Sequence, residues 1–221
     1  MKVKEKEGSH GLTPTDTGGK KLPEGWERKK LGEILEIARG GSPRPIKSYL
    51  TDASNGINWI KIGDVKPGTK YIGETAQKIK PEGIKKSRFV QEGDFLLSNS
   101  MSFGRPYILK TSGCIHDGWL VLKKKANNID ENYLFQVLGS NSVVEQFDSL
   151  AAGSTVRNLN TSLVSKVLIP LPSLLEQKHI VLEIEKISDE TKQLESIYQQ
   201  KITALDELKK SILKKAFEGK L

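Results

Sequence analysis

The sequence predicts an α+β protein, in which a mixed α/β domain is followed by one long C-terminal α-helix. Three observations support this class. Between residues 22 and 172, short apolar runs alternate with Gly, Pro, Asn and Ser, which is typical of strands joined by turns. Residues 131–151 instead place apolar side chains at helical spacing. Residues 174–217 contain neither Gly nor Pro, which favours one uninterrupted helix.

Residues 1–21 form the first segment, which is rich in Gly, Thr, Lys and Glu. A segment with so few large apolar side chains buries too little surface to offset its ordering entropy, so we expect a flexible N-terminal arm. Its lysines are not followed by an apolar stretch, as a secretory signal would require. The chain also has no run of eighteen apolar residues. We therefore expect a cytoplasmic protein that makes no membrane contact.

Residues 22–172 form the predicted domain. Its strands are expected in the runs LGEILEIAR, INWIKIGDV, GDFLLS, RPYILK and GWLVLKK. The segment from Glu131 to Ala151 is expected to form two short helices that are broken near Gly139. Three tryptophans, Trp26, Trp59 and Trp119, stand among apolar neighbours and are expected in the core.

Residues 173–221 form the predicted helix. Ser173 and Glu176 have the spacing of a capping box, and Gly219 follows the expected end. Apolar residues recur at alternating intervals of four and three, interrupted by Thr191 and Lys201: Ile180, Ile184, Ile187, Leu194, Tyr198, Leu205, Leu208 and Ile212. A helix of this length would be about 65 Å long, more than one domain can cover. We therefore expect a partner helix; the alternative, a helical hairpin, lacks a turn residue.

Positive charge is concentrated in the middle segment. The chain has a formal net charge of +8, and residues 22–172 hold 21 Lys/Arg against 15 Asp/Glu. Residues 173–221 hold nine of each. An anionic partner is therefore expected to bind the domain. The neutral helix is expected to have a role other than phosphate binding.

Motifs for catalysis are missing from the sequence. GxGxxG, GxSxG and HExxH do not occur, and GDVKPGTK lacks the order of a phosphate-binding loop, so PGT is interpreted as a turn. Cys114, His116 and Asp117 could suggest a nucleophile and base, but neighbouring residues in a strand point to opposite faces. One cysteine and three histidines argue against structural zinc. We expect no catalytic residue, cofactor or metal.

Several strings, taken in order, carry a family resemblance. They are LPEGWERKKLGEI (22–34), GGSPRP (40–45), INWIKIGDV (57–65), SFGRPYIL (102–109), GSTVRNLNTSLVSKVLIPLPSLLEQKHIV (153–181) and LKKSILKKAFEGKL (208–221). The junction IPLP...EQ..IV before a long helix that closes on AFEGKL is the most specific. The sequence resembles the specificity subunits of type I restriction-modification systems over about 200 of its 221 residues.

The resemblance implies a target-recognition domain (22–172) followed by a spacer helix (173–221). Full members have two such units in tandem, each reading half of a bipartite DNA site, with the spacer helices packed antiparallel. This chain has one unit, so we expect a homodimer with an antiparallel coiled coil that reads an interrupted palindrome. The implied partners are double-stranded DNA, modification (methyltransferase) subunits and restriction/motor subunits. The resemblance also implies that this chain itself is not catalytic.

Two alternatives stay open. The chain could be a coiled-coil assembly or regulatory protein that binds DNA without sequence preference. It could also be a fragment of a tandem subunit.

Candidate DNA-binding residues come from four strings. In ARGGSPRP, Gly40, Gly41 and Ser42 would let backbone approach a phosphate, and Arg39 and Arg44 could fork onto phosphate or guanine; an ordinary turn is the alternative. In SNSMSFGR, the candidates are Asn99, Ser100, Ser102 and Arg105, unless Phe103 packs that loop on the core. Arg157 is expected to position DNA or to belong to a structural element, and Lys123 and Lys124 are expected to bind phosphate unless they are merely solvated.

Overall fold

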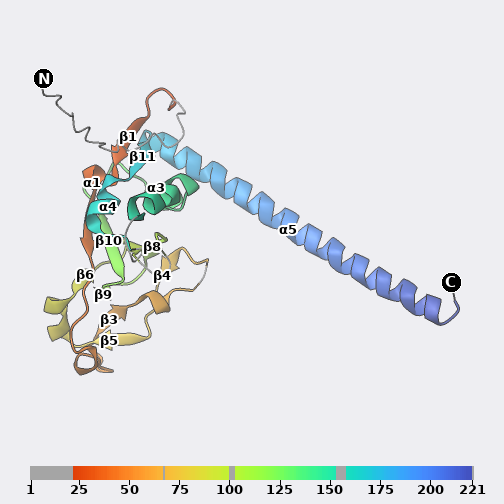
Figure 1. Cartoon of the computed structure of the whole chain (residues 1–221), viewed down its shortest axis with the longest axis horizontal. Coiled ribbons are helices and arrows are strands. Elements are labelled where there is room, and N and C mark those ends of the chain that lie inside the picture. Colours follow the sequence, from red (N-terminus) through yellow and green to blue (C-terminus); the bar gives the residue numbers. More distant parts are fainter. Residues whose placement is uncertain (1–21, 67, 100–102, 153–157, 221) are drawn as a thin grey trace, which may run out of the picture.

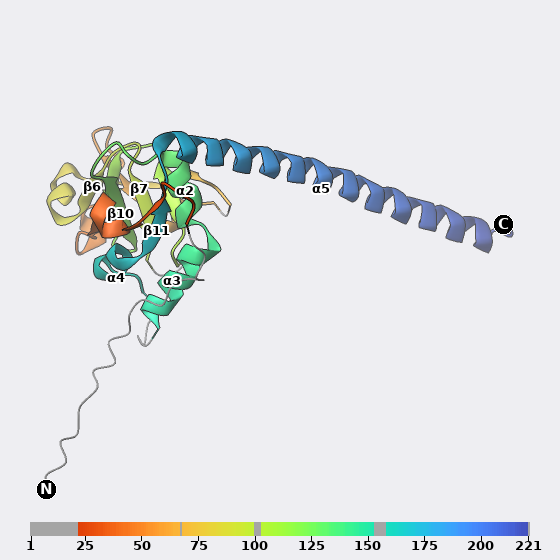
Figure 2. The same cartoon turned by 90° about the horizontal axis from the view of Figure 1, so that it is seen from above.

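The computed structural model describes residues 22–66, 68–99, 103–152 and 158–220. It consists of a mixed domain from which one long helix projects (Figures 1 and 2). The strands are β1 (Glu27–Lys30), β2 (Leu35–Arg39), β3 (Ile57–Ile60), β4 (Tyr71–Ile72), β5 (Gln77–Ile79), β6 (Arg88–Val90), β7 (Phe95–Ser98), β8 (Pro106–Leu109), β9 (Gly113–Ile115), β10 (Trp119–Lys124) and β11 (Leu168–Leu171). The α-helices are α1 (Leu31–Ile34), α2 (Glu131–Leu138), α3 (Asn141–Ala151), α4 (Thr161–Lys166) and α5 (Leu174–Phe217). The predicted arm, 1–21, lies outside the described residues.

A five-stranded sheet in the order β2-β10-β7-β8-β4 forms the centre of the domain. Both of its faces are covered. On β10, Leu120 and Leu122 pack into the cluster under the helices, whereas Trp119 and Val121 pack into a second cluster together with residues of β3, β6 and β9. Because successive side chains of a strand point to opposite faces, burial on both faces explains the unbroken apolar run GWLVL.

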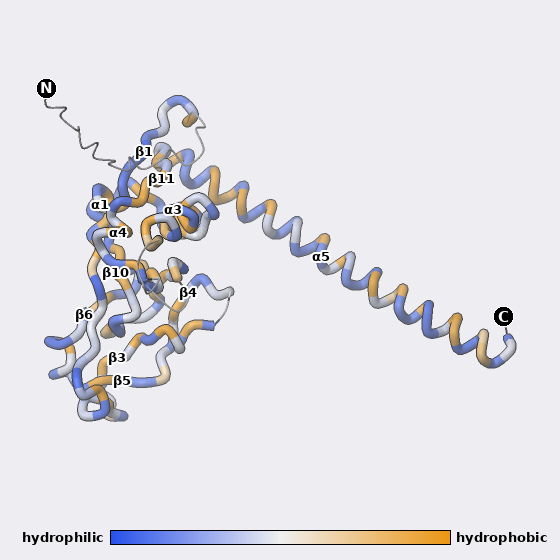
Figure 3. The backbone as a smooth tube through the Cα atoms, viewed as in Figure 1, coloured by the Kyte–Doolittle hydropathy of each residue, from blue (hydrophilic) through white to orange (hydrophobic). Residues whose placement is uncertain are grey.

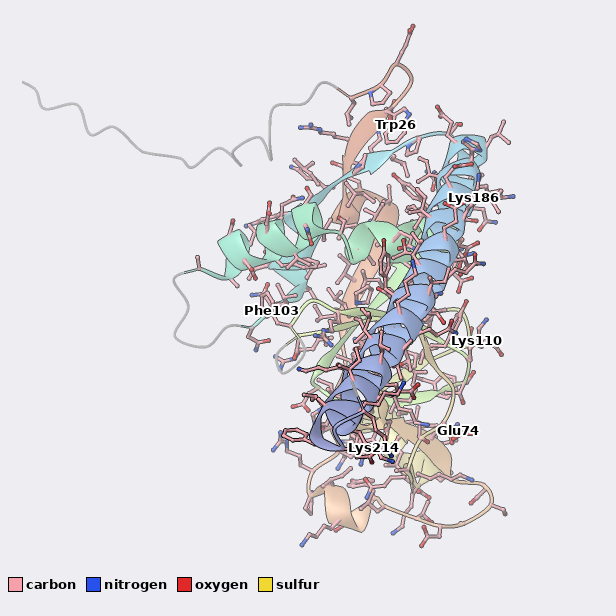
Figure 4. All side chains as sticks on the ribbon, turned by 90° about the vertical axis from the view of Figure 1, so that its right-hand side faces the viewer. Trp26, Glu74, Phe103, Lys110, Lys186 and Lys214 are labelled. Carbon is pink, nitrogen blue, oxygen red and sulfur yellow. The ribbon has the colours of Figure 1, made fainter. Side chains whose placement is uncertain are left out.

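A four-stranded sheet in the order β5-β3-β9-β6 lies at the lower end of the domain in Figure 1. The predicted core positions of Trp59 and Trp119 are confirmed, since they are 1% and 0% exposed. Trp26 is only partly buried, and its indole N–H donates to Glu176 Oε1 at 3.3 Å, at the first turn of α5 (Figure 4).

The two predicted short helices are confirmed as α2 and α3, which are separated at Gly139 and Ser140. One strand expectation was wrong in part. LGEILEIAR does not form a single strand, because residues 31–34 form the helical turn α1 and β2 begins at Leu35. Leu31 and Ile34 are three residues apart and both enter the core, which a helical turn permits and a strand does not.

The predicted continuous helix is confirmed as α5, with 44 residues. The backbone N–H of Ser173 donates to Glu176 Oε2 at 3.0 Å, and the Glu176 N–H donates to Ser173 Oγ at 3.4 Å, so the predicted capping box is present. At the other end, Gly219 has a φ of +68°, which favours glycine. Figure 3 shows apolar residues recurring along the helix.

The first two turns of α5 are anchored to the domain. Gln177 is fully buried, Val181 is 6% exposed, and Ile180 packs against the core cluster. Ile180, the first residue of the predicted dimerisation stripe, is therefore partly covered by the domain and less available to a partner helix than predicted. All residues from Leu182 to Lys220 are exposed, and Figure 4 shows side chains projecting around the helix between Lys186 and Lys214.

The buried amide of Gln177 fixes how α5 leaves the domain. Its Oε1 accepts from the Asp130 N–H at 2.7 Å, and its Nε2 donates to the carbonyls of Asn128 at 3.1 Å and Pro172 at 2.8 Å. Three backbone groups from two segments are thus satisfied by one side chain. Among the described residues, no helix is both long enough and apolar enough to cross a membrane.

Candidate DNA interface

The excess positive charge of the domain is concentrated in residues 39–91, which include most of the four-stranded sheet and its loops. This range holds 11 Lys/Arg against four Asp/Glu. It lies at the end of the domain opposite to β1 and β11, from which α5 departs (Figure 1). The positive surface and the long helix are therefore at different ends of the domain.

Residues 40–45, which follow β2, are called the recognition loop. Its glycines pack against the turn between β9 and β10. Gly40 N–H donates to the Trp119 carbonyl at 2.9 Å, and Gly41 N–H donates to the Ile115 carbonyl at 3.1 Å. A Cβ added at Gly40 would lie 2.2 Å from the carbonyl oxygen of His116. Glycine is therefore required by close packing. Because the N–H groups of Gly40 and Gly41 already donate inside the protein, these two glycines cannot offer them to a phosphate as expected.

Asp117, in the turn between β9 and β10, gathers side chains that the sequence analysis selected separately. Ser42 Oγ donates to Asp117 Oδ1 at 2.7 Å, and a guanidinium nitrogen of Arg44 lies 3.6 Å from Oδ2. The Asp117 carbonyl accepts from Arg39 Nε at 3.1 Å and from Asn99 Nδ2 at 2.9 Å. Both predicted loops thus meet at one residue.

His116 completes this turn. Its Nε2 lies 2.9 Å from Asp117 Oδ1, and its Nδ1 accepts from the Gly118 N–H at 2.9 Å. The argument that His116 and Asp117 point to opposite faces was wrong, because β9 ends at Ile115 and both residues lie in the turn. Cys114 is buried in β9, and this burial raises the pKa of its thiol, although a hydrogen bond with Ser87 lowers it in part. A protonated thiol is a poor nucleophile.

The carboxyl group of Asp117 is ionised at neutral pH. Burial raises its pKa, but the hydrogen bond from Ser42 and the positive charges that His116 and Arg44 can provide lower it by more, so the net pKa lies below the ordinary value. The site therefore contains a fixed negative charge among arginines.

Three arginines around this turn are exposed to solvent. The side chain of Arg44 is 82% exposed, and Arg39 and Arg88 are also exposed. Arg88 Nε donates to the Arg39 carbonyl at 2.8 Å. Arg88 was not predicted from the sequence, because only the folded sheet brings β6 next to the end of β2. These guanidinium groups are accessible to phosphate oxygens or base edges.

Arg105 lies near the same turn. Its N–H donates to Ser98 Oγ at 3.1 Å, and Ser98 pairs with Trp119, the first residue of β10. Phe103 packs against the core cluster, which favours the alternative of a packed loop. Ser100, Ser102 and Arg157 lie outside the described residues.

Some predicted residues are not available at this surface. Asn99 is 1% exposed, so its expected contact with a DNA groove is wrong for this arrangement, and its amide instead holds the turn. Lys123 and Lys124 lie at the opposite end of β10 and pair with Glu36 and Leu35 of β2. Lys123 also forms an ion pair of 3.3 Å with Asp94.

An open cleft of about 840 Å³ borders the recognition loop. Its wall is mainly apolar, with Pro45, Ile46 and Leu50, and it is flanked by the cationic side chains of Lys47 and Lys61. Lys61 Nζ donates to Gln77 Oε1 at 2.9 Å. The cleft extends the basic surface beyond the turn. Within the described ranges, no group of three or more His, Cys, Asp or Glu residues is placed to hold a metal ion.

The family profile described as "Type I restriction modification DNA specificity domain" matches residues 23–204. The chain belongs to this family. The match includes the recognition loops, the Asp117 turn and more than half of α5.

Two curated relatives illustrate the range of this similarity. The type I restriction enzyme MjaIX specificity subunit of Methanocaldococcus jannaschii is 28% identical over 179 residues, which cover 79% of this chain and 40% of the relative. The EcoDI specificity subunit of Escherichia coli is 27% identical over 206 residues, covering 90% of this chain and 43% of the relative. The chain thus spans less than half the length of these relatives.

Solved structures share the fold. A chain from a study of complex assembly and conformational transition of the type I R-M system is 26% identical, with a TM-score of 0.67, over 92% of this chain and 48% of that chain. The HsdS subunit from Thermoanaerobacter tengcongensis is 24% identical, with a TM-score of 0.64, over 92% of this chain and 47% of that chain. A 92% match is longer than the 173 residues before α5, so both similarities include part of this helix.

Proposed function

We propose that this chain recognises a DNA sequence and directs a type I restriction-modification complex to it, without catalysing a reaction itself. The observation that carries the proposal is that Arg39 and Arg44 contact Asp117 and Arg88 contacts Arg39, so that three arginines of the most basic segment, residues 39–91, lie around one turn. Membership of a family described by DNA specificity supports it.

Lysines and arginines are proposed to make different contacts with DNA at this surface. Lysines such as Lys47 and Lys61 supply charge for the phosphate backbone, which sets affinity and register but carries no sequence information. Exposed arginines have the planar fork that pairs with guanine O6 and N7, so Arg39, Arg44 and Arg105 are the proposed base-reading candidates. Gly40, Gly41, Ser42 and Asn99 hold the loops in place.

The remaining DNA candidates keep their earlier roles as proposals. Lys124 is exposed at the far end of β10, where it can reach only a phosphate distant from the turn. Lys123 would have to give up its ion pair with Asp94 to do the same. Ser100, Ser102 and Arg157 are proposed from the sequence alone.

The long helix is the proposed site of assembly. Its stripe of Ile184, Ile187, Leu194, Tyr198, Leu205, Leu208 and Ile212 is between 36% and 65% exposed. An apolar surface of this length favours a protein partner. We propose that it pairs with the same helix of a second copy and that the modification and restriction/motor subunits assemble on this scaffold, as the similarity to type I enzymes suggests.

Antiparallel pairing is the proposed geometry. The DNA-binding domain lies at the N-terminal end of a helix about 65 Å long, so a parallel pair would bring two basic domains together at one end. An antiparallel pair places them apart and relates them by a two-fold axis. Two identical reading surfaces then require identical half-sites on opposite strands, and the target is an interrupted palindrome.

Selection from a pool of random-sequence duplexes tests the proposed function. The full chain should enrich an interrupted palindrome whose half-site centres are about one helical turn apart. A chain that enriches no sequence, although it retains all duplexes to the same degree, would contradict the proposal and favour an assembly protein that binds DNA nonspecifically.

A further inference from the structure

A negative charge stands in the middle of the positive surface. The carboxylate of Asp117 is 32% exposed and is ionised at neutral pH. A surface that only clamps phosphate would lose affinity through such a charge, because DNA presents one negative charge on every phosphate. The position of Asp117 therefore needs an explanation other than affinity.

Asp117 contacts the loops in two different ways. Its backbone carbonyl holds Arg39 and Asn99, and these bonds do not depend on the side chain. Its carboxylate accepts a hydrogen bond from Ser42, lies beside Arg44, and has its Oδ1 2.9 Å from Nε2 of His116. Of the two cationic partners, Arg44 is the more accessible to a ligand, because its side chain is 82% exposed and that of His116 is 41% exposed.

The contact with Arg44 is electrostatic and leaves the guanidinium free to bind. A separation of 3.6 Å is too long for a hydrogen bond, so the pair aligns two charges without using a donor. The Arg44 side chain is 82% exposed, so its guanidinium is accessible to a ligand. The carboxylate therefore attracts this arginine while the fork remains accessible.

We infer that Asp117 is a specificity-determining positioning residue that orients Arg44 toward a guanine edge and weakens its attraction for phosphate. The inference rests on the proposed DNA-recognition function. A guanine offers two acceptors, O6 and N7, which match the guanidinium fork, whereas a phosphate competes mainly through its charge. The carboxylate offsets the charge of Arg44 and restricts its orientation, so the base contact gains relative to the phosphate contact.

The test compares three variants of the full chain on the selected duplex and on a scrambled duplex. Asp117→Asn keeps the size of the side chain, an acceptor for Ser42 and both carbonyl contacts, and it removes the charge. Arg44→Ala removes the proposed base reader. Asp52→Asn is the matched control, because it changes the charge equally at an exposed position of the same basic segment.

Asp117→Asn should strengthen binding to scrambled DNA, steepen the salt dependence by about one phosphate contact and reduce the specific-to-scrambled affinity ratio by roughly tenfold or more. Repeated selection should show the same G·C position relaxed in Asp117→Asn and in Arg44→Ala. Asp52→Asn should keep both the ratio and the preferred base.

An Asp117→Asn variant that keeps the wild-type ratio and base preference would overturn the inference. Relaxation at a position that Arg44→Ala leaves intact would also overturn it, because Asp117 would then act through another residue. Circular dichroism shows whether Asp117→Asn still folds. If it does not, and Arg44→Ala keeps the wild-type base preference, Asp117 has a structural role and the inference is rejected. Wild-type protein with equal affinity for both duplexes would reject the proposed function as well.

Discussion

Replacing Gly40 by alanine should destabilise the fold strongly, because the recognition loop is packed directly on backbone. The new methyl group would lie 2.2 Å from the His116 carbonyl oxygen and 2.9 Å from that of Ile115. Neither oxygen is a flexible side-chain end, so the loop itself must move. Such overpacking costs about 1–3 kcal/mol.

Movement of the loop would also break hydrogen bonds. The bonds from the Gly40 and Gly41 N–H groups contribute about 1 kcal/mol each. If both bonds break, the expected loss in the free energy of unfolding is therefore about 3–5 kcal/mol. Gly63→Ala is the matched control, because a Cβ there meets no atom within 4 Å, and it should change stability by less than about 1 kcal/mol.

Urea unfolding measures both variants at one protein concentration, since pairing of α5 would make stability depend on concentration. A Gly40→Ala variant as stable as Gly63→Ala would refute the reasoning, because it would show that the loop does not pack on the turn as described.

Three further predictions concern the helix and the turn. Gln177→Leu leaves three backbone groups without their partner and should lower the free energy of unfolding by about 2 kcal/mol or more, as measured by urea unfolding; an unchanged value would show that this anchor is dispensable. Ile184→Glu with Leu205→Glu should give monomers in light scattering, whereas Leu182→Glu, which is exposed but off the stripe, should not; a monomeric wild type would exclude self-pairing. The lowered pKa of Asp117 means that its carboxylate stabilises the fold above its ordinary pKa of 3.8, and that this contribution is lost as the pH falls through the lower folded-state value. The stability difference between wild type and Asp117→Asn should therefore be present at neutral pH and shrink in acid; a constant difference would contradict the pKa shift.

Features that depend on local sequence were predictable. The capping pair Ser173 and Glu176, followed by a long stretch without Gly or Pro, correctly predicted where α5 begins and that it is continuous. The break at Gly139 correctly separated α2 from α3. These features are set by neighbours within a few residues, and a single sequence contains all of that information.

Features that depend on contacts between distant segments were not predictable. Ser42 and Asp117 are 75 positions apart and meet only because β2 pairs with β10. Asn99 was interpreted as a surface residue, yet the pairing of β7 with β10 brings it to the Asp117 turn, where it is 1% exposed and its amide donates to the Asp117 carbonyl. The one local signal was Asp117-Gly118 between two apolar runs, which is typical of a tight turn but does not say which loop packs on it.

The N-terminal turns of α5 show the same limit. The heptad pattern predicts an apolar stripe, but it cannot tell which apolar residues the domain itself covers. Ile180 is partly buried against the core cluster, whereas Ile184, one turn later, is exposed. The stripe available to a partner therefore begins one turn later than the pattern suggests.

The most direct test of the central claim is the affinity ratio between the selected duplex and a scrambled duplex, measured at several salt concentrations. Sequence recognition by the arginines around Asp117 predicts that both affinities fall as salt rises, while the selected duplex stays roughly a thousandfold or more favoured. If both affinities fall together with a ratio near one, the surface binds only phosphate, and the chain does not recognise a DNA sequence.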